Sequence, residues 1–453
     1  MTTDICQAET GMTDPEAHAA WDRMICSFLA HGAATPVHLA DVLDREPDAV
    51  LPLAAKGLFC LMLGRREMVA TARDTAKAAR IALDNGGGPP RARAVLAALE
   101  TWLAGSPGGA IFHLEGALVR NPADTFTMKL CHGIRFIIGD AGGMRRSVER
   151  ALHGHGVDHP LRGYALGCHA FALEETGDYR LAERAGLAGL DLAGDDAWGL
   201  HAVAHVYDMT HRPDTGIALL DENEAAWSHC NNFRFHVWWH KALLHLDRGE
   251  LDRVLALYDT RIREEKTDDY RDVANASSLL VRLQLEGVDI GERWCELADL
   301  AETRISDGCL VFADLHYMLA LCGDHRSQAA RDLSTRIKAT GTVTTQDGQT
   351  AAHPGQAAAQ GLALFGEGKY CEAFLQLSTA RSHMNNIGGS HAQRDVFERI
   401  TVDAGIRAGL LDEVAAIVAQ RTELRAGRAD AFAESRMAQI ETARRASPPY
   451  AAQ

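Results

Sequence analysis

The sequence has little of what membrane, secreted or nucleic-acid-binding proteins need. No apolar run approaches the roughly 18–20 residues of a membrane helix. The first residues also lack the positive charge and apolar stretch of a secretory signal. The formal net charge is -15, so the chain has no basic field to attract nucleic acid or an anionic membrane. We therefore expect a cytoplasmic protein, with neither nucleic acid nor membrane as a partner.

Several chemical signatures are missing as well. The ten cysteines form no CxxC pair and no repeated spacing, which argues against a disulfide framework or a thiolate zinc site. The sequence has no Gly-rich phosphate loop, no dinucleotide-binding fingerprint and no G-x-S-x-G elbow. Nucleotide-driven chemistry, hydride transfer and α/β-hydrolase catalysis are therefore disfavoured.

Strand patterns are rare, because Val, Ile and Thr seldom alternate with polar residues. Ala, Leu, Arg and Glu instead recur at three- and four-residue spacing, which is the period of helices. The pattern predicts an all-α protein, with early helices over 15–30, 35–43 and 50–63.

One plan recurs along the chain, in which an Ala-rich helix ends at a Gly turn and a second Ala-containing helix follows. It is found at residues 93–124, 163–196, 233–259 and 357–380. This is the tetratricopeptide scheme. A helix pair cannot bury its apolar face alone, so we expect the pairs to stack into a tetratricopeptide-like α-α superhelix, a helical-repeat solenoid.

The repeats suggest how the chain is divided. We expect a flexible N-terminus over 1–15 and one helical-repeat domain over 16–410, followed by a C-terminal helix and loose tail over 411–453. A polar Thr/Gly/Gln-rich loop at 339–356 interrupts the domain. It is too long for a tight connector, so it is either a lid or a disordered link.

Histidine is abundant, with 21 residues, and four of them form two doublets. His201 and His205 stand in DDAWGLHAVAHVYDM, and His236 and His240 stand in FRFHVWWHKALLHL. A four-residue step places both members on one helix face. The doublets lie about 35 residues apart, close to one tetratricopeptide period, so neighbouring units should direct them into one pocket. Taken singly, each doublet is more often structural than ligating.

Two further polar residues stand where an apolar helix face is expected. Asp314 and His316 lie inside LVFADLHYMLAL. A buried carboxylate there is costly unless an imidazole, an Arg or a metal pairs with it. We include both residues with the two doublets among the candidate catalytic groups, although two positions two residues apart do not share one strict helix face.

A third group of candidates would contact a substrate. Gln393, Arg394 and Asp395 follow the Gly-Gly-Ser turn at 388–390, which looks like a helix start. Backbone N–H groups and Arg394 could hold a carboxylate or phosphate there. The alternative for Arg394–Asp395 is a structural salt bridge that ties the C-terminal repeat to the middle of the chain. Trp239 is a candidate wall of the pocket, beside the second doublet.

Two chemistries would use this set of residues. In one, three of the histidines His201, His205, His236 and His240, with or without Asp314, bind a divalent metal such as Zn²⁺. An open position on the metal is left where bound water is activated, and all four histidines without a carboxylate would be a less usual set. In the other, no metal binds, and a buried His/Asp pair performs acid–base work on a ligand anchored by an arginine. The sequence leaves both open.

Several motifs together resemble the tetratricopeptide repeat protein 38 family over about residues 35–410. They are HxVAHV within DDAWGLHAVAHVYDM, the HxxWH helix at His236–His240, ALYD at 256–259, the segment 272–294, FADLHYMLA at 312–320 and GGSHAQRDVF at 388–397. The resemblance implies a tetratricopeptide-like α-solenoid in soluble proteins whose biochemical role is poorly defined. His169, His211, His229 and His245 fall outside the pattern, and we treat them as incidental.

Two functions follow from the sequence. The first is a helical-repeat protein whose His-lined concave pocket binds and transforms a small polar molecule, by hydrolysis or acid–base chemistry. The alternative is a non-catalytic scaffold that binds a peptide or protein in an open groove. Because solenoid ends often pair, a homo-oligomer is also open.

Overall fold

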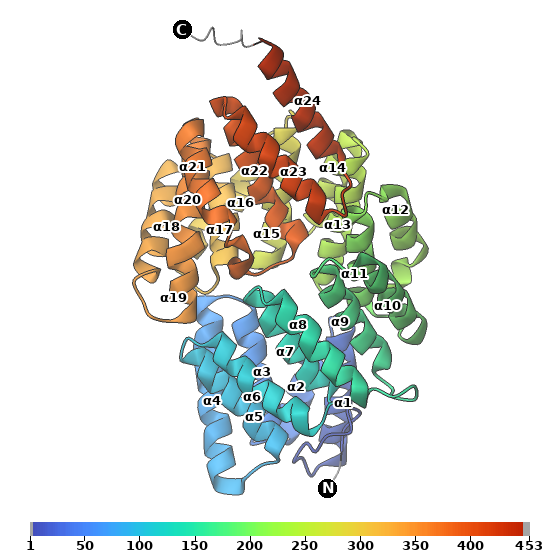
Figure 1. The fold of residues 1–453 in the computed structure, drawn as a ribbon. Helices are drawn as coiled ribbons and strands as arrows, with labels where there is room; N and C mark the ends of the chain where they lie inside the picture. Colours follow the sequence, from blue (N-terminus) through green and yellow to red (C-terminus); the bar gives the residue numbers. More distant parts are fainter. Residues whose placement is uncertain (1–2, 447–453) are drawn as a thin grey trace.

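The computed structural model describes residues 3–446, which form helices joined by short turns (Figure 1). Within that range only isolated bridges, between Thr3 and Glu9 and between Gly32 and Cys230, take the place of strands. The protein is all-α, as the sequence pattern predicts, and its helix pairs form a tetratricopeptide-like superhelix. No helix in these residues is both long enough and apolar enough to cross a membrane.

Most helices pack against their neighbour along the chain as a pair. The pairs are α1 (Pro15–Leu29) with α2 (Thr35–Arg45), α3 (Val50–Met62) with α4 (Arg66–Gly86), α5 (Pro90–Leu103) with α6 (Pro107–Arg120), α7 (Thr125–Ile137) with α8 (Ala141–Ala151), α9 (Arg162–Glu174) with α10 (Tyr179–Leu192), α11 (Ala197–Met209) with α12 (Pro213–Glu222), α13 (Phe233–Asp247) with α14 (Leu251–Leu257), α15 (Tyr270–Leu285) with α16 (Arg293–Arg304), α17 (Val311–Gly323) with α18 (Ser327–Thr340), α20 (Gln356–Gly366) with α21 (Tyr370–Arg381), and α22 (His391–Ala408) with α23 (Leu411–Leu424). The remaining elements are α19 (Gln346–Thr350), α24 (Ala431–Ala446) and single 3-10 or π turns at Leu152–Gly154, Glu224–Ala226, Tyr258–Ile262, Ala351–Gly355 and Met384–Ile387.

The four repeats predicted from sequence are confirmed as the pairs α5/α6, α9/α10, α13/α14 and α20/α21. Gly177 and Gly249 follow the first helix of their pairs with φ of +82° and +71°, a left-handed conformation that costs glycine nothing. A Cβ on Gly189 of α10 would lie 2.9 Å from the carbonyl oxygen of Gly163 in α9. Small residues therefore let these two helices approach closely.

The first helix of several later pairs lies in the interior. Almost every side chain of α11, α15 and α17 is buried, whereas α10, α16 and α18 bury only a few residues. A helix that is buried on every side must have neighbours on every side. The polar residues of the inner helices are consequently enclosed as well.

The superhelix closes on itself, because its C-terminal helices pack on the middle of the chain. α22 packs against α15 as well as against α21. The backbone N–H of His391, at the start of α22, donates to Glu175 at the end of α9 (2.8 Å). Figure 1 shows these C-terminal helices, in orange and red, next to the N-terminal helices in blue and teal.

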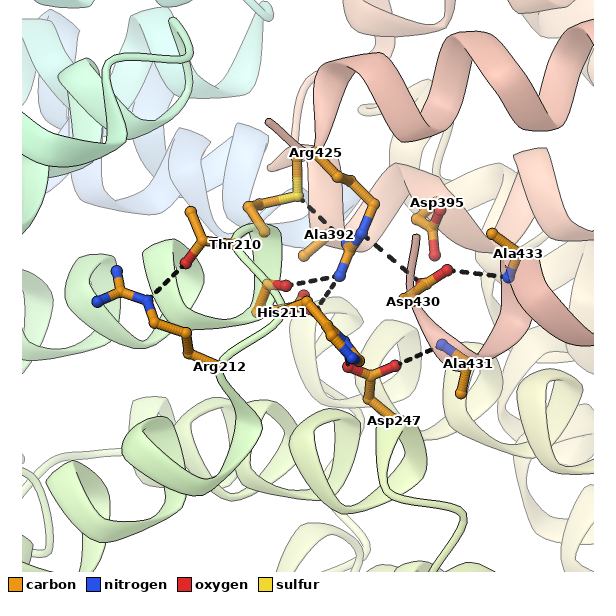
Figure 2. A network of polar contacts seen from close by, with 12 residues as sticks. Thr210, His211, Arg212, Asp247, Ala392, Asp395, Arg425, Asp430, Ala431 and Ala433 are labelled. Carbon is orange, nitrogen blue, oxygen red and sulfur yellow. Dashed lines mark hydrogen bonds and ion pairs between the residues drawn. The ribbon is translucent and has the colours of Figure 1, made fainter. Parts of the chain in front are cut away.

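Arginine–aspartate contacts fasten α23 and α24 to the middle of the chain (Figure 2). Arg425 donates to Asp208 at the end of α11 (2.9 Å). Arg421 donates to Asp430, just before α24 (2.6 Å). The backbone N–H of Ala431 donates to Asp247 of α13 (2.8 Å). The C-terminal helices are therefore part of the closed body.

The segment 339–356, expected to be either a lid or a disordered link, is an ordered connection that is helical over much of its length. α18 runs to Thr340, α19 and a π turn follow, and α20 begins at Gln356. Gln346 accepts a hydrogen bond from the N–H of Gly108 (2.8 Å), and its own N–H donates to Gly105 (3.0 Å). The polar residues of this segment contact the turn between α5 and α6, which sequence composition does not reveal.

The chain ends also differ from the expectation. Residues 3–14 are packed rather than flexible, because Asp4 is buried, contacts Arg91 and accepts a hydrogen bond from Trp21 (2.9 Å). The expected single C-terminal helix is two helices, α23 and α24. The expected loose tail, residues 447–453, lies outside the described residues.

Replacing Asp430 should destabilise the protein strongly. Its side chain is 3% exposed between Arg421 and Arg399, and removing one partner of a buried ion pair costs about 3–5 kcal/mol. We expect Asp430→Asn to lower the free energy of unfolding in urea by that order. Asp412→Asn is the matched control, because the Asp412 side chain is 90% exposed beside Arg444, and such pairs contribute about 1 kcal/mol or less. Equal effects of the two changes would contradict this account of the closure.

Candidate functional site

The two histidine doublets meet inside the superhelix. α11 carries His201 and His205, and α13 carries His236 and His240. The two helices pack against one another, and the four-residue step directs both pairs toward their interface. His201, His205 and His240 are at most 2% exposed, and His236 is half-buried. The joint pocket predicted from their spacing is therefore present as a cluster of four imidazoles.

The four Nε2 atoms converge. Nε2 of His201 lies 2.8 Å from Nε2 of His205 and 3.2 Å from Nε2 of His236. Nε2 of His240 lies 3.1 Å from Nε2 of His236. One ring nitrogen from each residue lies within 4.8 Å of all the others.

Hydrogen bonding between the rings cannot explain all three contacts. A neutral imidazole has one N–H, and each Nε2 offers one in-plane direction for a hydrogen bond. Nε2 of His201 is close to two other Nε2 atoms, so at most one of these contacts can be a hydrogen bond. At least one of these pairs of Nε2 atoms is therefore in close contact without a hydrogen bond between the two rings.

The opposite nitrogens of two rings face oxygen acceptors. Nδ1 of His236 lies 2.9 Å from Oδ1 of Asn275, and Nδ1 of His201 lies 3.4 Å from the carbonyl oxygen of Trp198. These acceptors favour a proton on Nδ1 and leave the lone pair on Nε2, as outer-shell partners do for metal-bound histidines.

The dimensions of the cluster fit a metal ion. With metal–nitrogen distances of about 2.0–2.1 Å, the edges of a tetrahedral site measure about 3.3–3.4 Å. The contacts of 2.8–3.2 Å between Nε2 atoms are close to that value. His201, His205, His236 and His240 could thus hold a divalent metal such as Zn²⁺.

Electrostatics keep these imidazoles neutral, which is the form that binds a metal. Burial, and then the neighbouring imidazoles, hold the pKa of His201 and His240 well below the usual range. Burial also lowers the pKa of His236, to about 4. Near neutral pH the cluster offers lone pairs rather than positive charge.

A cavity of about 250 Å³ opens beside His236. Lys129, Trp198 and Asn275 are among the residues that line it, together with several phenylalanines. The other three histidines of the cluster do not line this cavity. His236 is therefore the member of the cluster that faces the cavity.

Several buried polar atoms around the cavity have no hydrogen-bond partner within the described part of the chain. They are Nε1 of Trp198, Nδ2 of Asn275, Nε2 of His31 and both ring nitrogens of His132. Buried polar groups are normally paired. Their position around one cavity indicates a place for a polar molecule.

Sequence reasoning missed a second group of polar residues beside the cluster. Glu174 and Glu175 end α9, and His391 begins α22. Nδ1 of His205 lies 3.5 Å from Glu174, and the two ring nitrogens of His391 lie 2.9 Å and 2.8 Å from Glu174 and Glu175. Burial lowers the pKa of His391, but the two carboxylates outweigh it and raise the pKa to about 10.

Only part of this second group gave a signal in the sequence. His391 lies within the GGSHAQRDVF motif, which also carries the family resemblance. Glu174 and Glu175 stand just before the turn glycine Gly177, where charged residues are ordinary in a helix pair. Nothing local distinguishes them from exposed helix-end residues.

Asp314 and His316 do not join the four histidines. The Asp314 carboxylate forms an ion pair with Arg336 of α18 (2.8 Å). The Nδ1 of His316 donates to the carbonyl oxygen of Phe312 (2.7 Å), and its ring packs against Phe397. Asp314 therefore has the arginine partner that a buried carboxylate needs, and it is not a ligand of the cluster.

Gln393 and Arg394 bind protein groups. Gln393 and Ser390 form a capping box, with the Ser390 hydroxyl accepting from the Gln393 N–H and the Gln393 side chain accepting from the Ser390 N–H. Arg394 donates to the carbonyl oxygen of Gly388 (3.3 Å) and to Glu175 (3.3 Å). The helix start predicted at 388–390 is confirmed, and Arg394 orients a residue of the second group.

Asp395 does not pair with Arg394. It accepts from Arg399 (2.6 Å) and from Arg421 of α23 (2.7 Å), so it ties the C-terminal helices to α22. Trp239 does line the cluster. Its ring stacks on His236 at a centroid distance of 5.3 Å, and its Nε1 donates to Ser278 (3.1 Å).

The lowered pKa values predict that the metal-free protein is sensitive to acid. Unfolded histidines take up protons near pH 6.5, while the folded cluster resists protonation down to about pH 4 at His236. Between these values the unfolded chain binds more protons at these histidines than the folded protein does, so their contribution to stability falls as the pH falls. In chelator-treated protein we expect the free energy of unfolding to decrease from pH 7 to pH 5.

The variant His236→Asn should show a shallower dependence on pH, and the exposed His383→Asn should keep the slope of the unaltered protein. Each histidine contributes at most about 1.4 kcal/mol per pH unit to this slope. A free energy of unfolding that stays constant over this range would contradict the prediction.

No protein-family model matches the chain. Among solved structures, it is similar to the human IFIT1 dimer with m7Gppp-AAAA, with 12% identity over 97% of this chain and 96% of that one and a TM-score of 0.40. It is also similar to the P58(IPK) TPR domain, with 13% identity over 78% of this chain and 98% of that one and a TM-score of 0.21. Neither comparison bears on the chemistry of the site.

Proposed function

We propose that the protein is a metal-dependent enzyme that acts on a small polar molecule. His201, His205, His236 and His240 bind one divalent transition metal, such as Zn²⁺. The substrate occupies the cavity beside His236. The convergence of four buried Nε2 atoms, with Nδ1 atoms turned toward oxygen acceptors, is the observation that carries this proposal.

The position of His236 decides how a substrate reaches the metal. It is the cluster residue that lines the 250 Å³ cavity. The four imidazoles would hold the metal, and His236 would place it beside the cavity that the substrate occupies. When bound, the metal acts as a Lewis acid that activates water or polarises a carbonyl group. Hydrolysis or a lyase reaction suits this chemistry.

The cavity favours an anionic ligand. Lys129 contacts the Trp198 ring (4.3 Å to its centroid) and Sγ of Cys168 (3.8 Å), and it has no ion pair within the described residues. The unpartnered Trp198 Nε1 and Asn275 Nδ2 are both hydrogen-bond donors. A positive charge with free donors and aromatic walls fits a small organic acid, whose carboxylate accepts several hydrogen bonds.

Membership of the tetratricopeptide repeat protein 38 family is part of this proposal. The motif HxVAHV carries His201 and His205, the HxxWH helix carries His236 and His240, and GGSHAQRDVF carries His391. These three motifs carry the resemblance and lie far apart in the sequence, yet their histidines lie close together in the fold.

The rival function is a scaffold that binds a peptide or protein in an open groove. Such a groove needs an accessible concave face lined by side chains that can reach a peptide backbone. Here α22 packs on α15, and its first residue contacts the end of α9. Buried imidazoles and aromatic rings occupy the interior. These contacts support the enzymatic proposal over the scaffold.

The metal is tested by elemental analysis of untagged protein purified without chelating resin. We expect at least one equivalent of a transition metal per chain, and the double variant His201→Asn/His240→Asn should lose one equivalent. The control is His245→Asn, which removes a histidine paired with Glu250 outside the cluster. A double variant that keeps its full metal content and its helical circular dichroism would overturn the proposal.

The ligand class is tested at Lys129. Small carboxylates are screened by thermal shift, and those that bind the unaltered protein are measured by calorimetry. We expect Lys129→Met to weaken the affinity for such a carboxylate at least tenfold, and Lys129→Arg to weaken it less. Losing one charge-assisted hydrogen bond corresponds to about 1.5–3 kcal/mol. Lys338→Met, on α18, is the control and should bind normally. Unchanged affinity in Lys129→Met would remove the cavity from the proposal.

A further inference from the structure

A second group of ligand atoms adjoins the four-histidine cluster and shares one residue with it. Glu174, Glu175, His391 and His205 each offer one atom, and these atoms all lie within 4.8 Å of one another. His205 directs Nε2 toward the first cluster and Nδ1 toward Glu174. One imidazole thus stands between two groups of potential ligands.

Glu174 has no hydrogen-bond partner in the described part of the chain, and its contact with the His391 ring is an ion pair only. It is 1% exposed, and neither carboxylate oxygen forms a hydrogen bond within the described residues. Nδ1 of His205 and Nε2 of His391 are also buried without a hydrogen bond. A buried carboxylate without a hydrogen bond is costly. All four unpartnered atoms belong to neighbouring groups that face one another.

The distances show what kind of partner is missing. Nε2 of His391 is 2.9 Å from Glu174, and Nδ1 of His205 is 3.5 Å from it. Both pairs are close, yet neither forms a properly directed hydrogen bond. Ligand atoms about 2.0–2.2 Å from one cation are separated by about 2.8–3.6 Å. A cation placed between these atoms would satisfy all of them.

Glu175 has a different role from Glu174. Its carboxylate lies 2.8 Å from Nδ1 of His391 and accepts from the His391 backbone N–H (2.8 Å) and from Arg394 (3.3 Å). A carboxylate at Nδ1 leaves Nε2 of the same ring free to bind a metal. Glu175 therefore orients His391, with Arg394 holding Glu175 in place.

We propose that Glu174, Nε2 of His391 and Nδ1 of His205 bind a second divalent cation, and that His205 bridges the two metals through both ring nitrogens. The bridge rests on the proposed function, because it needs a metal in the four-histidine cluster. Binding the second cation displaces the Nε2 proton of the His391 imidazolium, and forming the bridge removes the single N–H proton of neutral His205. Both protons pass to solvent. The resulting imidazolate and the Glu174 carboxylate offset part of the charge of the two cations.

The two metals would be reached from different sides. The cavity of about 250 Å³ borders His236, whereas a second cavity, of about 560 Å³, borders His391 and Arg394. Figure 2 shows part of the wall of this second cavity, including Asp247, Asp395 and Arg425. Each metal position thus has its own route of entry.

Zinc stoichiometry tests the second site. Chelator-treated protein is titrated with Zn²⁺ by calorimetry and checked by elemental analysis. We expect two equivalents for the unaltered protein and one for Glu174→Gln and for His391→Asn. Glu183→Gln is the matched control, because Glu183 pairs with Arg212 away from the site, and it should still bind two.

The outcomes separate this inference from the proposed function. One equivalent in both the unaltered protein and Glu174→Gln would overturn the second site and leave the first intact. No binding at all would overturn both. Two equivalents in folded Glu174→Gln would place the second cation elsewhere and overturn this site. Where that variant fails to fold, one equivalent in the unaltered protein still overturns it.

The bridge has its own readout. With two equivalents of Cu²⁺, an imidazolate bridge couples the two unpaired electrons, so we expect a low-temperature electron paramagnetic resonance signal well below two spins per protein. Glu174→Gln with one equivalent should give a full single-copper signal. A signal of two independent spins in the unaltered protein would overturn the bridge.

Discussion

Every polar atom that the closed superhelix removes from water must find a partner inside it. α22 imposes this constraint, because it packs on α15 and places its first residue against the end of α9. An open solenoid would leave the histidines of α11 and α13 on a solvated concave face. Closure turns that face into an interior where unpaired groups are costly.

The closure itself depends on buried ion pairs. Asp395 joins α22 to α23 through Arg421, and Asp430 joins α23 to the start of α24. Arg425 then reaches Asp208 at the end of α11, the helix that carries the first doublet. Such pairs add little net stability compared with apolar packing, but each is costly to break. They therefore fix one arrangement of the C-terminal helices over the histidines.

In these ion pairs each aspartate is balanced by an arginine, and none of them includes a histidine of the cluster. His201 and its neighbours are neutral and close together, with lone pairs that no hydrogen-bond pattern can use in full. Glu174 likewise has two carboxylate oxygens without a hydrogen bond within the described residues. We propose cations as the partners of both groups, and each group borders one of the two cavities. The groups without hydrogen bonds and the two cavities thus lie in the same part of the fold.

The sequence by itself determined the helix pairs, their turn glycines and the two doublets. Helical periodicity is a local property, so the step from His201 to His205 fixes a shared face whatever surrounds it. The repeat period brought the second doublet alongside the first. The tertiary structure alone decided that Asp314 pairs with Arg336, and that Asp395 holds α23 instead of a substrate. It also brought Glu174 at the end of α9 beside His391 at the start of α22. Contacts made by closure depend on the summed geometry of many helix pairs, so they leave no local pattern in the sequence.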